Sequence, residues 1–81
     1  MERKEIFEKL TEFFRDVMDN DEIVLEETTS STDIDEWDSL AQTLLLAEIQ
    51  KEYNIRFLLA DTIRWKNVGE MVDTIIELCS K

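Results

Sequence analysis

The residues best suited to chemistry in this chain are the tripeptide Asp38-Ser39-Leu40, which lies where a long acidic stretch ends and an apolar helix is expected to begin. A serine hydroxyl at the start of a helix lies beside unpaired backbone N–H groups and the positive end of the helix dipole. Because these groups stabilise an anion, the sequence predicts a favourable site for a phosphate ester on Ser39. Two structural alternatives use the same residues: Ser39 and Gln42 fit a capping box, and Asp38 alone fits an N-cap.

The rest of the composition argues against catalysis by the chain itself. It contains no histidine, which removes the commonest general base and the commonest metal ligand. Its one cysteine, Cys79, cannot form an internal disulfide, and no apolar run is long enough to span a membrane. No secretory apolar segment follows the charged residues 1–4. We therefore expect a soluble cytoplasmic protein with no catalytic residue and no metal site of its own.

The net charge of −11 is concentrated in one segment, residues 19–38, which contains nine acidic residues and no basic one. The chain has no basic stripe to replace the counterions of a nucleic acid, so nucleic acid is not expected as a partner. An acidic segment of this kind favours either a basic protein surface as partner or simple solubility. Charge alone does not separate these two explanations.

Hydrophobic periodicity predicts an all-α bundle of three main helices and one short helix. The expected helices span residues 3–18, 39–53 and 58–65, followed by a last helix that begins after the capping pattern of Asn67 and Glu70. The absence of proline and the single glycine favour helices over a turn-rich β fold. One small domain covering residues 1–81 is expected, with a long loop between the first two helices.

The second expected helix carries two apolar stripes. The stripe assigned to the core consists of Leu45, Leu46, Ile49 and Tyr53. The other stripe, which we call the docking stripe, consists of Leu40, Leu44, Ala47 and, at its end, Lys51. Both stripes cannot easily face one small core, so the docking stripe is expected to be exposed for a partner. The alternative is that the helix is central and widely buried.

With these elements in place, the chain resembles an acyl carrier protein of the phosphopantetheine-dependent family over essentially its full length. The tripeptide alone is unspecific, but its position within this pattern of helices is specific. The resemblance rests on the tripeptide, on Ile34 ahead of it, on the apolar run from Leu45 to Tyr53, on Ile55 and Phe57, and on Val68-Gly69-Glu70-Met71-Val72 at the start of the last helix.

The resemblance implies that Ser39 carries a 4′-phosphopantetheine arm, transferred from coenzyme A by a phosphopantetheinyl transferase. The thiol of the arm would hold acyl groups as thioesters. Asp38 and Leu40 would complete the attachment site, with Asp38 capping the helix and recognised by the transferase. The protein would then be a monomeric carrier, not an enzyme, and would serve acyl-loading and acyl-processing enzymes of the ligase, ketosynthase or acyltransferase type. The expected acyl pocket consists of Leu46, Ile49, Trp65 and Met71.

The chain differs from many fatty-acid carriers around the attachment motif. Glu36 stands where many of those carriers have glycine, and Trp37 completes a Trp-Asp-Ser-Leu variant that resembles discrete carriers of specialised acyl pathways. Positions that are often acidic in the second helix of fatty-acid carriers hold Leu44, Gln50 and Lys51.

Three roles are therefore open. The first is an acyl carrier in fatty-acid, polyketide-like or other specialised biosynthesis. The second is an aminoacyl or peptidyl carrier with the same chemistry at Ser39. The third is an unmodified acidic adaptor that docks through Leu40 and Leu44.

Overall fold

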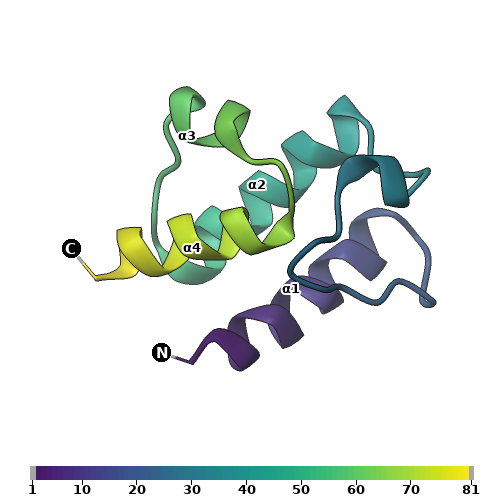
Figure 1. Ribbon diagram of the computed structural model, residues 1–81, viewed down its shortest axis with the longest axis horizontal. Coiled ribbons are helices and arrows are strands. Elements are labelled where there is room, and N and C mark those ends of the chain that lie inside the picture. Colours follow the sequence, from purple (N-terminus) through teal and green to yellow (C-terminus); the bar gives the residue numbers. More distant parts are fainter. Residues whose placement is uncertain (1, 81) are drawn as a thin grey trace.

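The computed structural model describes residues 2–80, and Figure 1 shows the arrangement of its helices. These are α1 (Arg3–Val17), α2 (Ser39–Tyr53), α3 (Leu59–Arg64) and α4 (Val68–Cys79), with a short 3-10 turn, η1 (Ser31–Asp33), between α1 and α2. Residues 2–80 contain no strand. The predicted all-α fold with three longer helices and one short helix is confirmed. No helix in this part of the chain has the length and apolarity needed to cross a bilayer.

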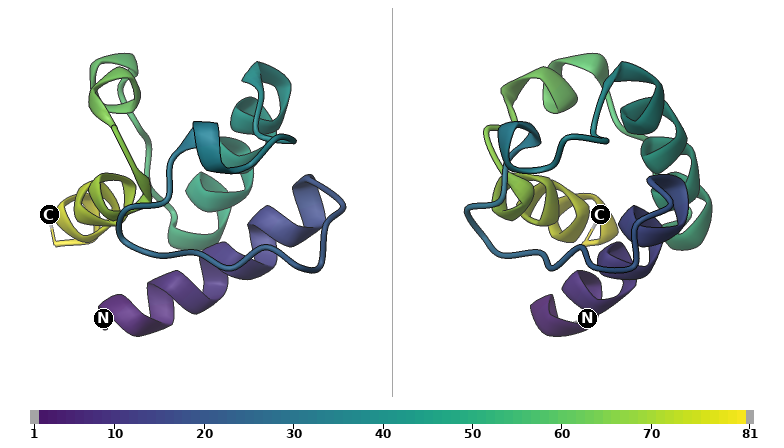
Figure 2. Two further views of the ribbon diagram at one scale, coloured as in Figure 1. Left: turned by 45° about the vertical axis from the view of Figure 1, so that its right-hand side comes forward. Right: turned by 90° about the vertical axis from the view of Figure 1, so that its right-hand side faces the viewer.

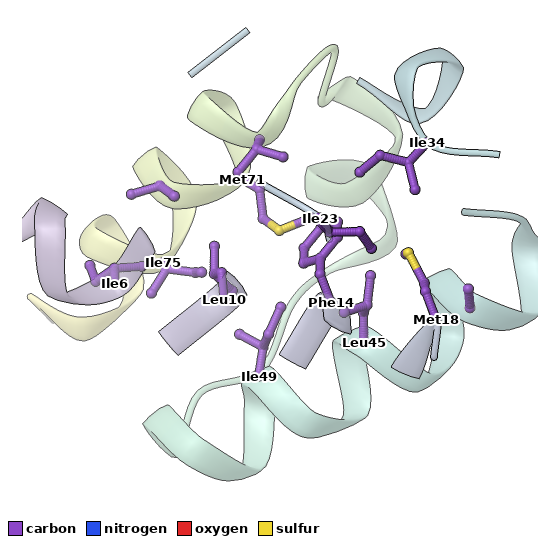
Figure 3. Packing of buried hydrophobic residues seen from close by; sticks show 13 residues of the cluster. Ile6, Leu10, Phe14, Met18, Ile23, Ile34, Leu45, Ile49, Met71 and Ile75 are labelled. Carbon is purple, nitrogen blue, oxygen red and sulfur yellow. The ribbon is translucent and has the colours of Figure 1, made fainter. Parts of the chain in front are cut away.

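The core forms where the apolar stripes of α1, α2 and α4 meet, as Figure 3 shows. On α1 and α2 the buried side chains recur every four residues, the spacing that places them on one helix face. Burying a large apolar side chain of this kind contributes about 1.5–3 kcal/mol to stability. The fully buried side chains are Ile6, Leu10 and Phe14 of α1, Leu45 and Ile49 of α2, and Val68, Met71, Val72 and Ile75 of α4.

The expected core position of Leu46 is wrong. The buried face of α2 consists of Ala41, Leu45 and Ile49, and Leu46 is only partly buried and does not belong to the apolar core. Successive residues of an α-helix are rotated by about 100°. Leu46, one residue beyond the centre of the buried face, is therefore turned away from α1 and α4.

The long connection between α1 and α2 runs past α4 before it reaches α2 (Figure 1 and Figure 2). The carbonyl oxygens of Glu27 and Thr29 accept hydrogen bonds from the backbone N–H groups of Gly69 (2.9 Å) and Val68 (2.8 Å). The first N–H groups of a helix have no partner within the helix, so the connection supplies the acceptors that α4 lacks. The connection is therefore hydrogen-bonded to α4 at Glu27 and Thr29 before it reaches Ser39 at the start of α2.

Arg3 reinforces this attachment from the first turn of α1. Its guanidinium donates to both carboxylate oxygens of Glu27 (2.6 Å each), to Asp73 Oδ1 (2.7 Å) and to the carbonyl oxygen of Gly69 (3.0 Å). The hydrogen bonds from Arg3 lower the pKa of Glu27 below its usual value. One side chain therefore links α1, the connection and α4. Because Arg3, Glu27 and Asp73 are distant in sequence, no local sequence pattern predicts that they are in contact.

Candidate functional site

The site begins at the junction between the long connection and α2. Asp38 has extended backbone geometry (φ −107°, ψ −171°), and its Oδ1 accepts a hydrogen bond from the backbone N–H of Ala41 at 2.8 Å. Asp38 is therefore the N-cap of α2. Of the two capping alternatives in the sequence, the Asp38 cap is the one that the structure shows. Ser39 follows as the first residue of the helix, and it is exposed.

The hydroxyl of Ser39 is left free by this arrangement. Among residues 2–80 it has no hydrogen-bond partner, and the backbone N–H groups of Ser39 and Leu40 have no acceptor there. Leu40 is also exposed, with 69% of its surface accessible. An exposed hydroxyl beside two unpaired N–H groups is a favourable place for an attached anion.

Gln42, the other residue of the capping-box alternative, has a different partner. Its Oε1 accepts a hydrogen bond from the indole Nε1 of Trp37 at 2.6 Å. The ring of Trp37 in turn packs edge-on against Phe14, with centroids 4.9 Å apart and an interplanar angle of 86°. Trp37 thus ties the segment immediately before Ser39 both to α2 and to the core.

A cleft of about 360 Å³ opens beside Ser39. Three parts of the chain form it: the η1 turn, the start of α2, and the segment from α3 to α4. The first two parts contribute Ser31, Trp37, Asp38, Ser39 and Gln42. The third part contributes Thr62, Trp65, Lys66, Asn67 and Met71. The cleft therefore combines polar side chains with two indole rings and one buried thioether.

Trp65 lines this cleft and makes two contacts with neighbouring side chains. Its Nε1 donates to Thr74 Oγ1 at 2.9 Å, and its ring meets Phe57 edge-on with centroids 5.1 Å apart. Of the four residues expected to form an acyl pocket, Trp65 and Met71 line the cleft. The other two, Leu46 and Ile49, do not line it; Ile49 packs in the core, and Leu46 is a partly buried residue of α2 outside the cleft.

The docking stripe lies on the surface of α2. Leu40 and Leu44 are 69% and 47% exposed, and Ala47 and Lys51 are exposed as well. The structure therefore does not support the alternative in which α2 is widely buried, while the role of the stripe in docking stays a prediction. The neighbouring helix α3 adds Leu59 and Ile63, which are 78% and 74% exposed.

The amino-acid sequence alone does not indicate that Leu59 and Ile63 of α3 are exposed. The available signal was a cluster of apolar side chains in a segment of only six helical residues, too short to show a periodicity that separates inside from outside.

Within residues 2–80, no group of three or more histidine, cysteine, aspartate or glutamate side chains is placed to hold a metal ion.

One solved structure is similar to the chain in both fold and sequence: the solution NMR structure of a holo acyl carrier protein from Geobacter metallireducens. The two sequences are 39% identical, and the match covers 91% of this chain and 85% of that one, with a TM-score of 0.85. No protein-family model and no curated protein matches the chain.

Proposed function

The chain belongs to the acyl carrier protein family, and we propose that it carries acyl groups on a 4′-phosphopantetheine arm attached to Ser39. When attached, the arm supplies the thiol that holds acyl groups as thioesters. The observation that supports this assignment most strongly is the exposed Ser39 hydroxyl, which has no hydrogen-bond partner among residues 2–80 and stands at the start of α2.

The residues around Ser39 fit a phosphodiester at this position. Asp38 fixes the start of the helix through its bond to Ala41, so the free N–H groups of Ser39 and Leu40 lie in the first turn. A negative charge at such a helix end is stabilised by about 0.3–1 kcal/mol. Asp38 is itself an anion, but its carboxylate is engaged in capping. It serves as a positioning residue and as a recognition feature for the transferase.

The exposed apolar surface supports a role in serving several enzymes. Leu40 and Leu44 of α2 are exposed apolar side chains that lie outside the core of the domain. We propose that the phosphopantetheinyl transferase and acyl-loading or acyl-processing enzymes dock there in turn. Interface energy concentrates in a few centrally buried side chains, and rim charges mainly tune the association rate, so we expect apolar contact to contribute more than charge at this surface.

The surface of α2 also supports a specialised acyl pathway over housekeeping fatty-acid synthesis. Leu44 and Lys51 are exposed at positions where acidic side chains would attract basic partner surfaces. The nine acidic residues of segment 19–38 place that charge elsewhere, on the connection ahead of Ser39.

The test uses the full chain produced without its arm. Incubation with coenzyme A, magnesium and a broad-specificity phosphopantetheinyl transferase should raise the intact mass by one arm. A subsequent acyl transfer should raise it again by one acyl group. A chain that gains no mass under conditions that fully modify a known carrier would act as an unmodified adaptor, and the proposal would be wrong.

A further inference from the structure

Two side chains that line the cleft beside Ser39, those of Gln42 and Asn67, carry hydrogen-bond donors with no acceptor among residues 2–80. The side-chain oxygen of Gln42 accepts from Trp37 (2.6 Å), and that of Asn67 accepts from the backbone N–H of Glu70 (3.0 Å). These two bonds fix which end of each carboxamide is the NH₂ group. Neither NH₂ group has an acceptor among residues 2–80. The Lys66 ammonium has no ion-pair partner in this part of the chain either.

The apolar part of the lining has the opposite character. The indole N–H groups of Trp37 and Trp65 already donate to Gln42 and Thr74, so these rings offer only their apolar surfaces to a ligand. Met71, a residue that is 1% exposed, lies at the base of this lining. A ligand that fits the cleft therefore carries carbonyl acceptors together with short apolar segments.

We propose that this cleft binds the phosphopantetheine arm, with the NH₂ groups of Gln42 and Asn67 donating to the carbonyl oxygens of its amides. The inference rests on the proposed attachment at Ser39, which itself lines the cleft. The arm contains two amide groups separated by methylene groups, and a dimethyl-substituted carbon lies between its phosphate and the first amide. It therefore offers the acceptors and the apolar segments that the lining requires.

An aliphatic acyl chain fits this lining less well. It has no acceptor for the unused donors, and each polar group that loses its water without gaining a partner costs about 1–3 kcal/mol.

The chain offers a direct readout of this binding. It contains five carboxamide side chains, of which Gln42 and Asn67 line the cleft and Asn20, Gln50 and Asn54 do not. NMR spectra of the ¹⁵N-labelled full chain before and after arm attachment, with attachment verified by intact mass, should show larger shifts of the NH₂ resonances in the cleft than outside it. Both tryptophans of the chain line the cleft, so their fluorescence should become less accessible to acrylamide.

Matched variants separate binding from a general effect of the arm. Gln42→Glu keeps the acceptor for Trp37 and removes the NH₂ donors. Gln50→Glu makes the same change outside the cleft, where Gln50 Oε1 accepts from the backbone N–H of Phe57 (2.9 Å). After arm attachment, Gln42→Glu should lose the gain in protection from acrylamide, and Gln50→Glu should keep it.

The outcomes distinguish this inference from the proposed function. Absence of the mass gain would contradict both. A mass gain without preferential shifts at Gln42 and Asn67 in the original chain would overturn the cleft assignment alone. Shifts that arise only after an acyl group is loaded would also overturn it, because the cleft would then hold cargo.

Discussion

Replacing Gly69 by alanine tests the attachment of the long connection to α4. Gly69 lies in the first turn of α4, and its φ is not positive, so its backbone is open to any residue. Helix propensity alone predicts that Gly69→Ala stabilises the protein by up to about 1 kcal/mol. The packing predicts the opposite sign. A Cβ at this position would lie 2.8 Å from the carbonyl oxygen of Glu27 and 2.6 Å from its Oε1.

The magnitude follows from what the added methyl group must displace. The Glu27 side chain can rotate away, but its carbonyl oxygen is backbone and can move only with the connection. Forcing extra volume into a packed contact costs about 1–3 kcal/mol. Weakening the hydrogen bonds from Gly69 to Glu27 and from Val68 to Thr29 costs about 0.5–1.5 kcal/mol each. These costs sum to about 2–6 kcal/mol, and after subtraction of the propensity gain of about 1 kcal/mol a net loss of roughly 1–5 kcal/mol is expected.

Thermal unfolding followed by circular dichroism measures this loss. In a domain of this size each kcal/mol corresponds to about 4–8 °C, so the midpoint should fall by at least about 4 °C. Ala47→Gly, on the exposed face of α2, is the control for helix propensity. It makes the reverse exchange without a packing contact and should destabilise the protein by about 1 kcal/mol through propensity alone. An unchanged or higher midpoint for Gly69→Ala would show that the connection does not pack on α4 in solution.

Three further predictions concern the cap, the docking stripe and the acidic connection. Asp38→Ala should lower the unfolding free energy by about 1 kcal/mol through loss of the α2 cap. Asp35→Ala, which removes an exposed carboxylate with no hydrogen bond or ion pair among residues 2–80, should not, and equal losses would contradict the capping role. Leu44→Asp should slow acyl transfer to a partner enzyme without changing the helical circular-dichroism signal. Lys51→Glu should slow the transfer less, and this slowing should fade with salt. Unfolding by Leu44→Asp would place Leu44 in the core. The melting midpoint should rise when salt is increased from 0.01 M to 0.15 M, because the Debye length falls from about 30 Å to about 8 Å and repulsion among the acidic residues of segment 19–38 weakens. Glu27 is the only acid of this segment with an ion pair among residues 2–80, so the other acids repel one another without such a partner. A constant or falling midpoint would contradict this prediction.

Features set by local sequence were predictable. The bounds of α2 follow from a capping aspartate before an apolar run and from Asn54 after it, which adopts the left-handed geometry (φ 54°) that ends many helices. Asn67 likewise caps α4 as its position predicts, accepting from the N–H of Glu70. The side chain of Glu70 departs from the expected capping box, because it accepts from the backbone N–H of Lys66 (2.7 Å).

Features that depend on tertiary contact were not predictable from the sequence. The sequence contains Arg3, Glu27 and Asp73, but nothing local indicates that one guanidinium joins the other two residues. The same holds for the cleft. Its lining comes from three separated segments, and the free donors of Gln42 and Asn67 are identified only when the partners of their oxygens are known.

The central claim is that Ser39 carries the arm, and site-specific modification tests it most directly. The chain and its Ser39→Ala variant are incubated with coenzyme A, magnesium and a broad-specificity transferase, and their intact masses are measured after circular dichroism has established that both are folded. The original chain should gain one arm, and the variant should gain none. A variant that still gains an arm, at Ser30, Ser31 or Ser80, would contradict the assignment.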